Sequence, residues 1–330
     1  MKNFWVELPR PFFALAPLAN VTDAAFRRLI AKYSKPGALY VTYTEFVSAD
    51  GLMLAGQEGR AKLMRDLEFC ETERPIVAQF FTATPEHMEQ AAALAQRLGF
   101  DGVDVNMGCP DKAIEKQGAG AKLMQNPELA VRLIAAAKRG APNLPISVKT
   151  RLGYNKDILD EWLPALLAAK PAAITIHART RKEMSKVPAR WERVKRAVEI
   201  RNETGNKTLI LGNGDLKDLA DAGKKIKDSG ADGAMLGRAV FGRPWLFAEE
   251  KFSEKSLDPF RRLNILVEHT KLFEELLGDI KNFAIMKKHF KAYVEGFPGA
   301  KELRMQLMET TNAAEVEGVI GSWLAQNNPI

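Results

Sequence analysis

Short apolar, β-branched segments recur from residue 12 to residue 236 of this 330-residue chain, and segments of helical periodicity separate them. We predict eight strands, at Phe12–Ala16, Leu39–Tyr43, Ile76–Phe80, Gly102–Val105, Ile146–Lys149, Ala173–His177, Thr208–Leu211 and Gly233–Leu236. Helix starts lie between them, such as Thr84 before Pro85 and Asn126 before Pro127. Since parallel strands need crossover helices, eight such units predict an α/β fold, a (β/α)8 TIM barrel spanning residues 1–250.

A doubly wound open sheet is the structural alternative to the barrel. That fold places a Gly-x-Gly-x-x-Gly turn after its first strand, and this chain has no such motif there. The barrel is therefore the favoured architecture.

After residue 250 the pattern becomes entirely helical. We predict helices at Pro259–Leu277, Phe283–Glu295, Gly299–Met308 and Ala313–Ala325, which would form a small C-terminal helical bundle domain over residues 251–330.

Composition excludes several classes of protein. With 46% hydrophobic and 27% charged residues the chain is not a disordered one, and two cysteines, Cys70 and Cys109, cannot form a disulfide framework. The apolar run Trp162–Ala169 is too short for a membrane span, and residues 1–10 lack a signal-peptide core. We expect a monomeric cytoplasmic protein.

The active site of a TIM barrel lies where its strands end at the carboxyl face. The residues at those ends are rich in polar and reactive types: Pro17, Glu45, Gln79, Asn106, Cys109, Lys149, His177, Asn213 and Gly237.

Cys109 follows a strand and stands between glycine and proline, which predicts a loop over the barrel mouth. Cys70 has no such context and is expected to be structural. A thiol with a reference pKa of ~8.5 is mostly protonated at neutral pH. Cys109 can therefore act as a proton donor, or as a nucleophile if a neighbour activates it.

Lys149 ends the fifth strand, and strand alternation places Lys149 and Arg151 on the same side. A lysine in a barrel mouth favours a ligand anion or carbonyl as its partner. His177 ends the sixth strand, where a structural and a ligand-binding role are both open. The chain has four histidines and no pair at metal-ligand spacing, so we expect no metal.

The last two strand-to-helix turns contain glycine, in Asn213-Gly214-Asp215 and Gly237-Arg238. In TIM barrels these two loops often build a phosphate site from backbone amides. The residues thus predict a barrel that binds a phosphorylated ligand beside a cysteine, a lysine and a histidine.

Several ordered motifs over nearly the whole chain resemble the tRNA-dihydrouridine synthases, in their bacterial branch. The motifs are Ala16-Pro17-Leu18-Ala19, Asn106-Met107-Gly108-Cys109-Pro110, Gly118-Ala119-Gly120-Ala121, Lys149-Thr150-Arg151, His177-Ala178-Arg179-Thr180-Arg181, Asn213-Gly214-Asp215, Gly237-Arg238 and Gly242-Arg243-Pro244-Trp245. The family usually has methionine at the position of Leu18 and glycine at those of Asn20 and Ala178.

The resemblance implies a flavin enzyme that reduces uridine in tRNA, with FMN as cofactor and NADPH as electron donor. It implies that Cys109 protonates C5 of uracil. The cofactor would be bound by Pro17, Leu18, Ala19, Gln79, Lys149, His177, Asn213, Gly214, Asp215, Gly237 and Arg238. The tRNA partner would be contacted by Asn106, Arg151, Arg179, Arg181, Lys287 and Lys291, and by the helical domain 251–330.

The residues are also compatible with other functions. A lyase could use Lys149 as a Schiff-base amine, although Cys109 would then have no role. A related flavin barrel could act on a free pyrimidine, and a barrel without catalysis could simply bind RNA.

The net charge of +7 is concentrated in one segment. Residues 179–201 hold nine basic and three acidic side chains. We expect this segment, which follows the sixth strand, to lie against an RNA backbone.

Overall fold

The computed structural model describes residues 3–35, 39–248 and 258–327. Eight parallel strands pair in chain order and close into a barrel, which confirms the predicted TIM barrel. The strands are β1 (Phe12–Leu15), β2 (Tyr40–Ser48), β3 (Ile76–Phe81), β4 (Gly102–Met107), β5 (Ile146–Arg151), β6 (Ala173–His177), β7 (Leu209–Asn213) and β8 (Gly233–Leu236).

Strand β2 differs most from its predicted bounds, because it continues past Tyr43 to Ser48. Its pairing with β3 shifts register between Tyr43 and Phe46. Thr44 and Glu45 of this continuation are buried, and the Oγ1 of Thr44 accepts a hydrogen bond from the backbone N–H of Gln79 (3.1 Å). Glu45 consequently lies inside the strand rather than at its end.

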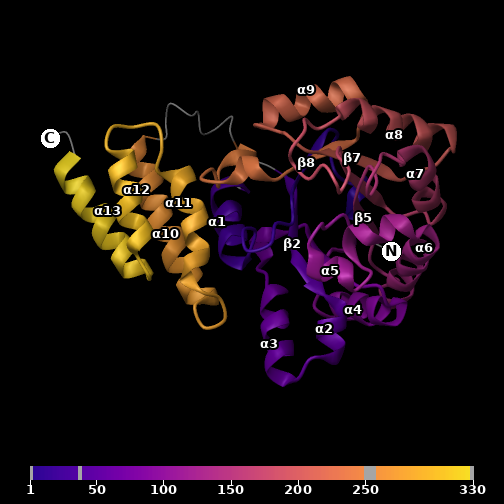
Figure 1. The fold of residues 1–330 in the computed structure, drawn as a ribbon, viewed down its shortest axis with the longest axis horizontal. Coiled ribbons are helices and arrows are strands. Elements are labelled where there is room, and N and C mark those ends of the chain that lie inside the picture. Colours follow the sequence, from indigo (N-terminus) through magenta and orange to yellow (C-terminus); the bar gives the residue numbers. More distant parts are fainter. Residues whose placement is uncertain (1–2, 36–38, 249–257, 328–330) are drawn as a thin grey trace. The chain divides into compact units, whose positions relative to one another are not determined.

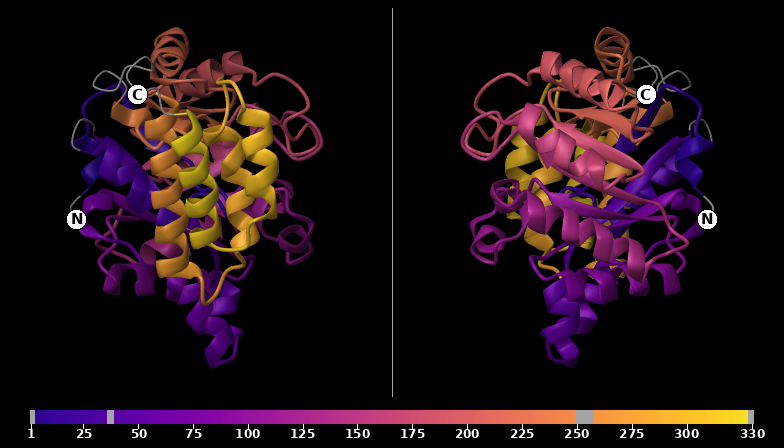
Figure 2. Two further views of the ribbon diagram at one scale, coloured as in Figure 1. Left: turned by 90° about the vertical axis from the view of Figure 1, so that its left-hand side faces the viewer. Right: turned by 90° about the vertical axis from the view of Figure 1, so that its right-hand side faces the viewer.

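Helices cover the outside of the barrel (Figures 1 and 2). They are α2 (Ala49–Leu54), α3 (Gln57–Asp66), α4 (Pro85–Arg97), α5 (Lys112–Lys116), α6 (Pro127–Gly140), α7 (Leu159–Ala168), α8 (Trp191–Glu203) and α9 (Leu219–Ser229). The start of α6 follows its sequence signal, since the side chain of Asn126 accepts the N–H of Leu129 and Pro127 occupies the first turn.

The amino-terminal end of the barrel is filled by apolar side chains. Trp5, from the short 3-10 helix η1 (Phe4–Val6), is 1% exposed, and its ring lies 5.6 Å from that of Phe12. Val41, Val77 and Leu211 belong to the same cluster. Because this end is closed by apolar packing, a polar site can open only at the carboxyl ends of the strands.

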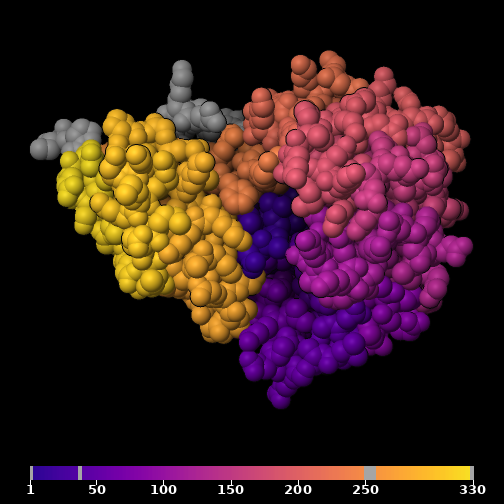
Figure 3. Space-filling model, viewed as in Figure 1, coloured from indigo at the N-terminus to yellow at the C-terminus, as the bar shows by residue number. Residues whose placement is uncertain are grey.

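Helix α3 packs beside α2 and is the most exposed of these helices. None of its residues is buried, and Leu54, at the end of α2, is 73% exposed. Figure 3 shows the segment as a violet projection at the lower edge of the view.

The described residues form two compact units. The first comprises residues 3–19, 39–68 and 74–237, and the second comprises residues 20–35, 69–73, 238–248 and 258–327. The second unit contains α1 (Ala24–Ser34), α10 (Pro259–Leu277), α11 (Lys287–Tyr293), α12 (Ala300–Glu309) and α13 (Ala313–Asn327), with the 3-10 helices η2 (Glu71–Glu73), η4 (Arg238–Val240), η5 (Leu246–Ala248) and η7 (Phe283–Met286).

Helix α1 belongs to the second unit although it lies between β1 and β2 in the chain. The ring of Phe26 stacks on that of His269 of α10 at 4.7 Å, and the hydroxyl of Ser34 donates to the carbonyl of Pro244 (2.7 Å). A buried ion pair joins Arg27 to Glu73 of η2 (2.7 Å). The predicted boundary at residue 250 lies outside the described residues, and the division of roles between 1–250 and 251–330 stays a prediction.

The helical nature of the C-terminal region is confirmed. Among the described helices, none combines the length and the apolarity that crossing a bilayer requires.

Candidate functional site

Side chains of neighbouring strands lie in register toward the carboxyl end of the barrel. Three successive rows, from the interior outward, are Gln79–Asp104–Ser147, Asn106–Lys149–Thr175 and Arg151–His177–Asn213. Such layers, built from adjacent strands, are how a TIM barrel fills its interior. The structure thus gathers most of the predicted strand-end residues at one end of the first unit.

Cys109 lies in the loop between β4 and α5, and three contacts fix its backbone. The Oδ1 of Asn106 accepts the backbone N–H groups of Gly108 (3.1 Å) and Cys109 (2.9 Å). The carbonyl of Cys109 accepts the N–H of Ala121 (2.9 Å). The thiol is therefore carried by a loop whose conformation is set by hydrogen bonds on both of its sides.

Gly120 allows the last of these contacts, the bond between Ala121 and the carbonyl of Cys109. It has a φ of +59°, and a Cβ added there would lie 2.8 Å from the carbonyl oxygen of Cys109. Only glycine tolerates this combination of left-handed backbone and close approach.

The thiol of Cys109 is partly buried, and this burial raises its pKa. The carboxylate of Asp111 raises that pKa further, whereas a backbone hydrogen bond, Lys149 and Arg151 lower it. The net direction is upward, so the thiol is protonated at neutral pH. A protonated thiol is a proton donor rather than a nucleophile.

Lys149 lies in the same row as Asn106 and is neither fully buried nor fully exposed. Desolvation lowers its pKa to about 8, the nearby Arg151 adds to this effect, and Asp104 and Cys109 oppose it. At neutral pH the side chain remains a cation held in a poorly solvated position. Such a group favours an anionic or strongly polar ligand.

Gln79, Asp104 and Asn106 form a continuous hydrogen-bonded chain. The Nε2 of Gln79 donates to Asp104 (2.7 Å), and the Nδ2 of Asn106 donates to the Oε1 of Gln79 (2.9 Å). Ser147 donates to the other oxygen of Asp104 (2.5 Å). Asp104 and Ser147 were not predicted as site residues, although Asp104 stands two positions before Asn106 and so shares its face of the strand.

The turn after β7 is shaped by Gly214, whose φ is +121°. A Cβ there would meet Ala189 at 2.9 Å and the ring of His177 at 3.1 Å. The indole of Trp191 donates to the carbonyl of Gly214 (2.9 Å), and the Nδ2 of Asn213 donates to the carbonyl of Met235 (2.7 Å). The bond from Trp191 joins the turn after β7 to α8, and the bond from Asn213 holds the ends of β7 and β8 together.

Arg179, predicted to contact RNA, is 2% exposed. Its guanidinium binds the carboxylate of Asp215, the carbonyl of Val187 (2.6 Å) and the Nε2 of His177 (3.2 Å). Because a guanidinium only donates, His177 accepts this bond through Nε2. Arg179 thus orients two predicted cofactor residues, His177 and Asp215.

Arg151 and Arg181, the other two predicted RNA-binding arginines of the barrel, also bind other loops. Arg151 is 8% exposed and donates to the carbonyl groups of Gly108 (2.8 Å) and Thr180 (3.3 Å). Arg181 forms an ion pair with Glu115 of α5, a residue that the sequence did not single out. These bonds join the loops after β4, β5 and β6.

The basic segment 179–201 is largely neutralised by acidic partners. Its ion pairs are Arg179–Asp215, Arg181–Glu115, Arg190–Glu183, Arg193–Asp157, Arg193–Asp160, Arg196–Asp160, Arg196–Glu199, Arg196–Glu203 and Arg201–Asp232. Lys182, Lys186 and Lys195 are exposed. If this segment meets RNA, the exposed lysines are the cations placed to do so.

The first strand contributes Pro17, Leu18 and Ala19 just beyond its end. Leu18 packs against the apolar cluster of the barrel. A Cβ added at Gly237 would have nothing closer than Ala16 at 3.6 Å, and Leu18 at 3.9 Å. A side chain at Gly237 would therefore make ordinary van der Waals contacts, and Arg238 begins η4 in the second unit.

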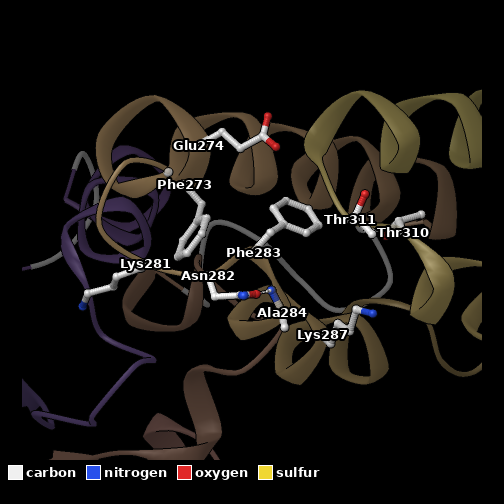
Figure 4. A pocket seen from close by; sticks show the side chains of 10 residues that line it. Phe273, Glu274, Lys281, Asn282, Phe283, Ala284, Lys287, Thr310 and Thr311 are labelled. Carbon is white, nitrogen blue, oxygen red and sulfur yellow. Dashed lines mark hydrogen bonds between the residues drawn. The ribbon is translucent and has the colours of Figure 1, made fainter.

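The second unit has a cavity of about 590 Å3, lined by residues of α10, η7, α11 and the segment before α13. Figure 4 shows Phe273 and Phe283 near its centre and Lys287 at its margin. The Nζ of Lys287 donates to the carbonyl of Met308 (2.5 Å). Of the two tail lysines predicted to bind RNA, Lys287 thus lines this cavity, whereas Lys291 is exposed on α11.

In the part of the chain that the structure describes, no three histidine, cysteine, aspartate or glutamate side chains are grouped so as to hold a metal ion.

The family model for dihydrouridine synthase matches residues 14–326. The chain belongs to the dihydrouridine synthase family. A probable tRNA-dihydrouridine synthase of Staphylococcus aureus is 38% identical over 327 residues, which are 98% of this chain and 97% of that protein. The probable tRNA-dihydrouridine synthase 2 of Bacillus subtilis is 39% identical over 323 residues, 97% and 96% of the two chains.

Two solved structures have a fold similar to that of this member of the dihydrouridine synthase family. A histamine dehydrogenase from Rhizobium sp. 4-9 superposes with a TM-score of 0.53 at 10% identity, covering 79% of this chain and 49% of that one. A 2-naphthoyl-CoA reductase gives a TM-score of 0.53 at 12% identity, with 72% and 49% covered. At these identities the likeness is one of fold alone.

Proposed function

We propose that this protein reduces the C5=C6 bond of specific uridines in tRNA to dihydrouridine, with FMN as cofactor, NADPH as electron donor and Cys109 as the proton donor to C5. Membership of the dihydrouridine synthase family supports the reaction, and the names of its relatives support tRNA as substrate. A tRNA substrate also places the expected activity in the cytoplasm.

The observation that carries the proposal is the state of Cys109. Addition of hydrogen across a C=C bond requires a proton donor next to the carbon that does not receive hydride. Burial keeps the thiol protonated at neutral pH, and Asn106 and Ala121 hold its backbone. A fixed, protonated thiol at the end of the barrel suits this role.

The residues after β7 and β8 fit the phosphate-bearing chain of FMN. Gly214 has a φ of +121° in the turn after β7, and Gly237 has no side chain to fill the space beside Ala16 and Leu18. Lys149 supplies a cation next to Asn106, its register partner on the neighbouring strand. When bound, FMN would supply the hydride for C6 of uracil.

Lys149 would stabilise negative charge on the polar edge of the flavin ring. Gln79 is 0% exposed and donates to Asp104, so it would support the cofactor site through its neighbours rather than by direct contact. Pro17, Leu18, Ala19, His177, Asn213, Asp215 and Arg238 complete the proposed cofactor set. The uridine must leave its stack in the folded tRNA, at a free-energy cost of a few kcal/mol that contacts to the RNA must offset.

The proposed RNA contacts divide into two groups. Lys287 and Lys291 of the helical unit can meet phosphates, whereas Asn106 is buried and would act on the base through the backbone of Cys109, which it holds. Arg151, Arg179 and Arg181 already bind carbonyl or carboxylate groups of the protein. Their contribution to substrate binding would be to shape the loops that carry it.

The experiment is reconstitution. Purified protein should carry an absorbing flavin and, with NADPH, should form dihydrouridine in tRNA from a strain that lacks this enzyme. Cys109→Ala should retain the flavin and its reduction by NADPH but lose product formation. Protein without flavin, or a Cys109→Ala variant with the wild-type rate, would refute the corresponding part of the proposal.

The same preparation tests the lyase alternative. The lowered pKa of Lys149 is a property that Schiff-base lysines share. Borohydride trapping of a carbonyl compound on Lys149 would favour the lyase, whereas family membership favours the reductase.

A further inference from the structure

Asp104 is a fully buried carboxylate with no role in the proposed reaction. It lies in β4, is 0% exposed, and accepts hydrogen bonds from Ser147 (2.5 Å) and Gln79 (2.7 Å). A buried carboxylate is unfavourable unless its oxygens are bonded, so its presence here calls for a physical reason.

The bonds that start at Asp104 have a defined direction. An ionised carboxylate can only accept hydrogen bonds, so Gln79 must turn its NH2 group toward Asp104. The Oε1 of Gln79 then faces the other way and accepts a bond from Asn106 (2.9 Å). Asn106 in turn has its Oδ1 directed away from Gln79.

The other end of the chain of bonds demands the same direction. The backbone N–H groups of Gly108 and Cys109 can only donate, and both donate to the Oδ1 of Asn106, at 3.1 and 2.9 Å. An acceptor at one end and two donors at the other leave only one orientation of the two carboxamides that satisfies every bond.

We propose that Asp104 is a positioning residue: its carboxylate sets the direction of the relay Asp104–Gln79–Asn106, which holds the backbone of Cys109. The relay is a property of the protein by itself. It rests on the proposed function only where it gives the positioned thiol the task of proton donation.

The electrostatics agree with an ionised Asp104 under working conditions. Desolvation raises its pKa to about 6, while Ser147, Gln79 and Lys149 lower it. The carboxylate is therefore ionised at neutral pH, which is the state that fixes the relay.

The test is the variant Asp104→Asn. It keeps the shape of the side chain but replaces a group that can only accept hydrogen bonds by one that can also donate them. An asparagine no longer obliges Gln79 to donate to it. A second arrangement then becomes accessible, in which both carboxamides are reversed and the NH2 of Asn106 points at two N–H donors. We expect the amides of residues 107–110 to exchange hydrogen about tenfold faster, as for the loss of about one hydrogen bond. We also expect faster alkylation of Cys109 by iodoacetamide, measured in a Cys70→Ser background.

The matched control is Asp232→Asn. Asp232 is also a buried carboxylate of the barrel, but it accepts from Arg201 and from the N–H of Ile210, at the amino-terminal end of the strands. This variant should leave the exchange of residues 107–110 and the alkylation of Cys109 at the wild-type rates.

If Asp104→Asn keeps the wild-type exchange and alkylation rates, the proposal is wrong. Should that variant not fold, Gln79→Leu breaks the relay at its middle and must produce the same faster exchange, and an unchanged rate again overturns the proposal. Neither measurement uses tRNA, so a wild-type protein without reductase activity would refute the proposed function and leave the relay intact. In an active enzyme, Asp104→Asn should lower kcat about tenfold or more with little change of KM for tRNA.

Discussion

The Nε of Arg151 donates a hydrogen bond to the carbonyl of Gly108 at 2.8 Å, so the last residue of β5 holds the loop that carries Cys109. The same guanidinium reaches the carbonyl of Thr180 (3.3 Å). One side chain therefore joins the loops after β4 and β6, which are separated by some 70 residues of chain.

Replacing Arg151 by methionine should release these loops. The aliphatic packing is retained, but two carbonyl groups lose their donor, at about 1–3 kcal/mol each when they stay buried. We expect a lower Tm and retained flavin. We also expect kcat to fall roughly 100-fold or more, the loss that a misplacement of about 1 Å can cause. Thermal unfolding and single-turnover reduction of tRNA measure the two effects. Wild-type turnover in Arg151→Met would show that the clamp has no part in catalysis.

Gly120 and Gly205 form a matched pair of glycines for testing the contact with Cys109. Their φ angles are +59° and +64°, but a Cβ at Gly120 would strike the carbonyl of Cys109 whereas one at Gly205 would meet nothing within 4 Å. Gly205→Ala should cost only the left-handed strain of about 1–2 kcal/mol. Gly120→Ala should cost more and should also abolish uridine reduction. Equal losses of Tm, with activity intact in both variants, would mean that the close approach is unimportant.

The pH dependence of stability should contain a contribution from Lys149. Its pKa is about 8 in the folded protein against 10.5 for the free side chain, so between these values the unfolded chain binds more protons than the folded one. The free energy of unfolding should therefore gain a rising contribution from pH 8 to 10.5. Lys149→Met should remove this contribution and, at pH 7, raise the free energy of unfolding by about 1–3 kcal/mol while weakening flavin binding. Urea unfolding at several pH values measures it; identical pH profiles for the two proteins would contradict the prediction.

The segment 179–201 offers two kinds of cation with different expected effects. Lys182, Lys186 and Lys195 are exposed, whereas Arg193 and Arg196 are ion-paired with Asp157 and Asp160.

Changing the three lysines to glutamine should weaken tRNA binding and reduce the slope of log K against log salt by about 0.7–0.9 for each phosphate that the variant no longer neutralises. Arg193→Gln with Arg196→Gln is the comparison, and it should change stability more than that slope. Binding titrations at several salt concentrations decide between them. If the lysine variant binds tRNA like the wild type, the segment is ordinary surface.

Local patterns in the chain were enough to predict the barrel. The alternation of β-branched segments with helical ones predicted all eight strands, and β6 and β8 have the predicted bounds. The end of β2 was predicted five residues short, because Thr44 and Glu45 are polar and only their burial against β3 makes them strand residues.

What the sequence determined by itself was the position of each chemical group along a strand, since side-chain parity and the strand ends follow from short-range geometry. It could not determine which charges meet. Arg181 and Glu115 are 66 positions apart, and Arg27 and Glu73 are 46 apart, so these pairs exist only because packing brings their elements together. The tertiary structure therefore turned the arginines of a basic segment into loop clamps, and it turned Asp104 from an ordinary strand residue into the start of the relay behind Cys109.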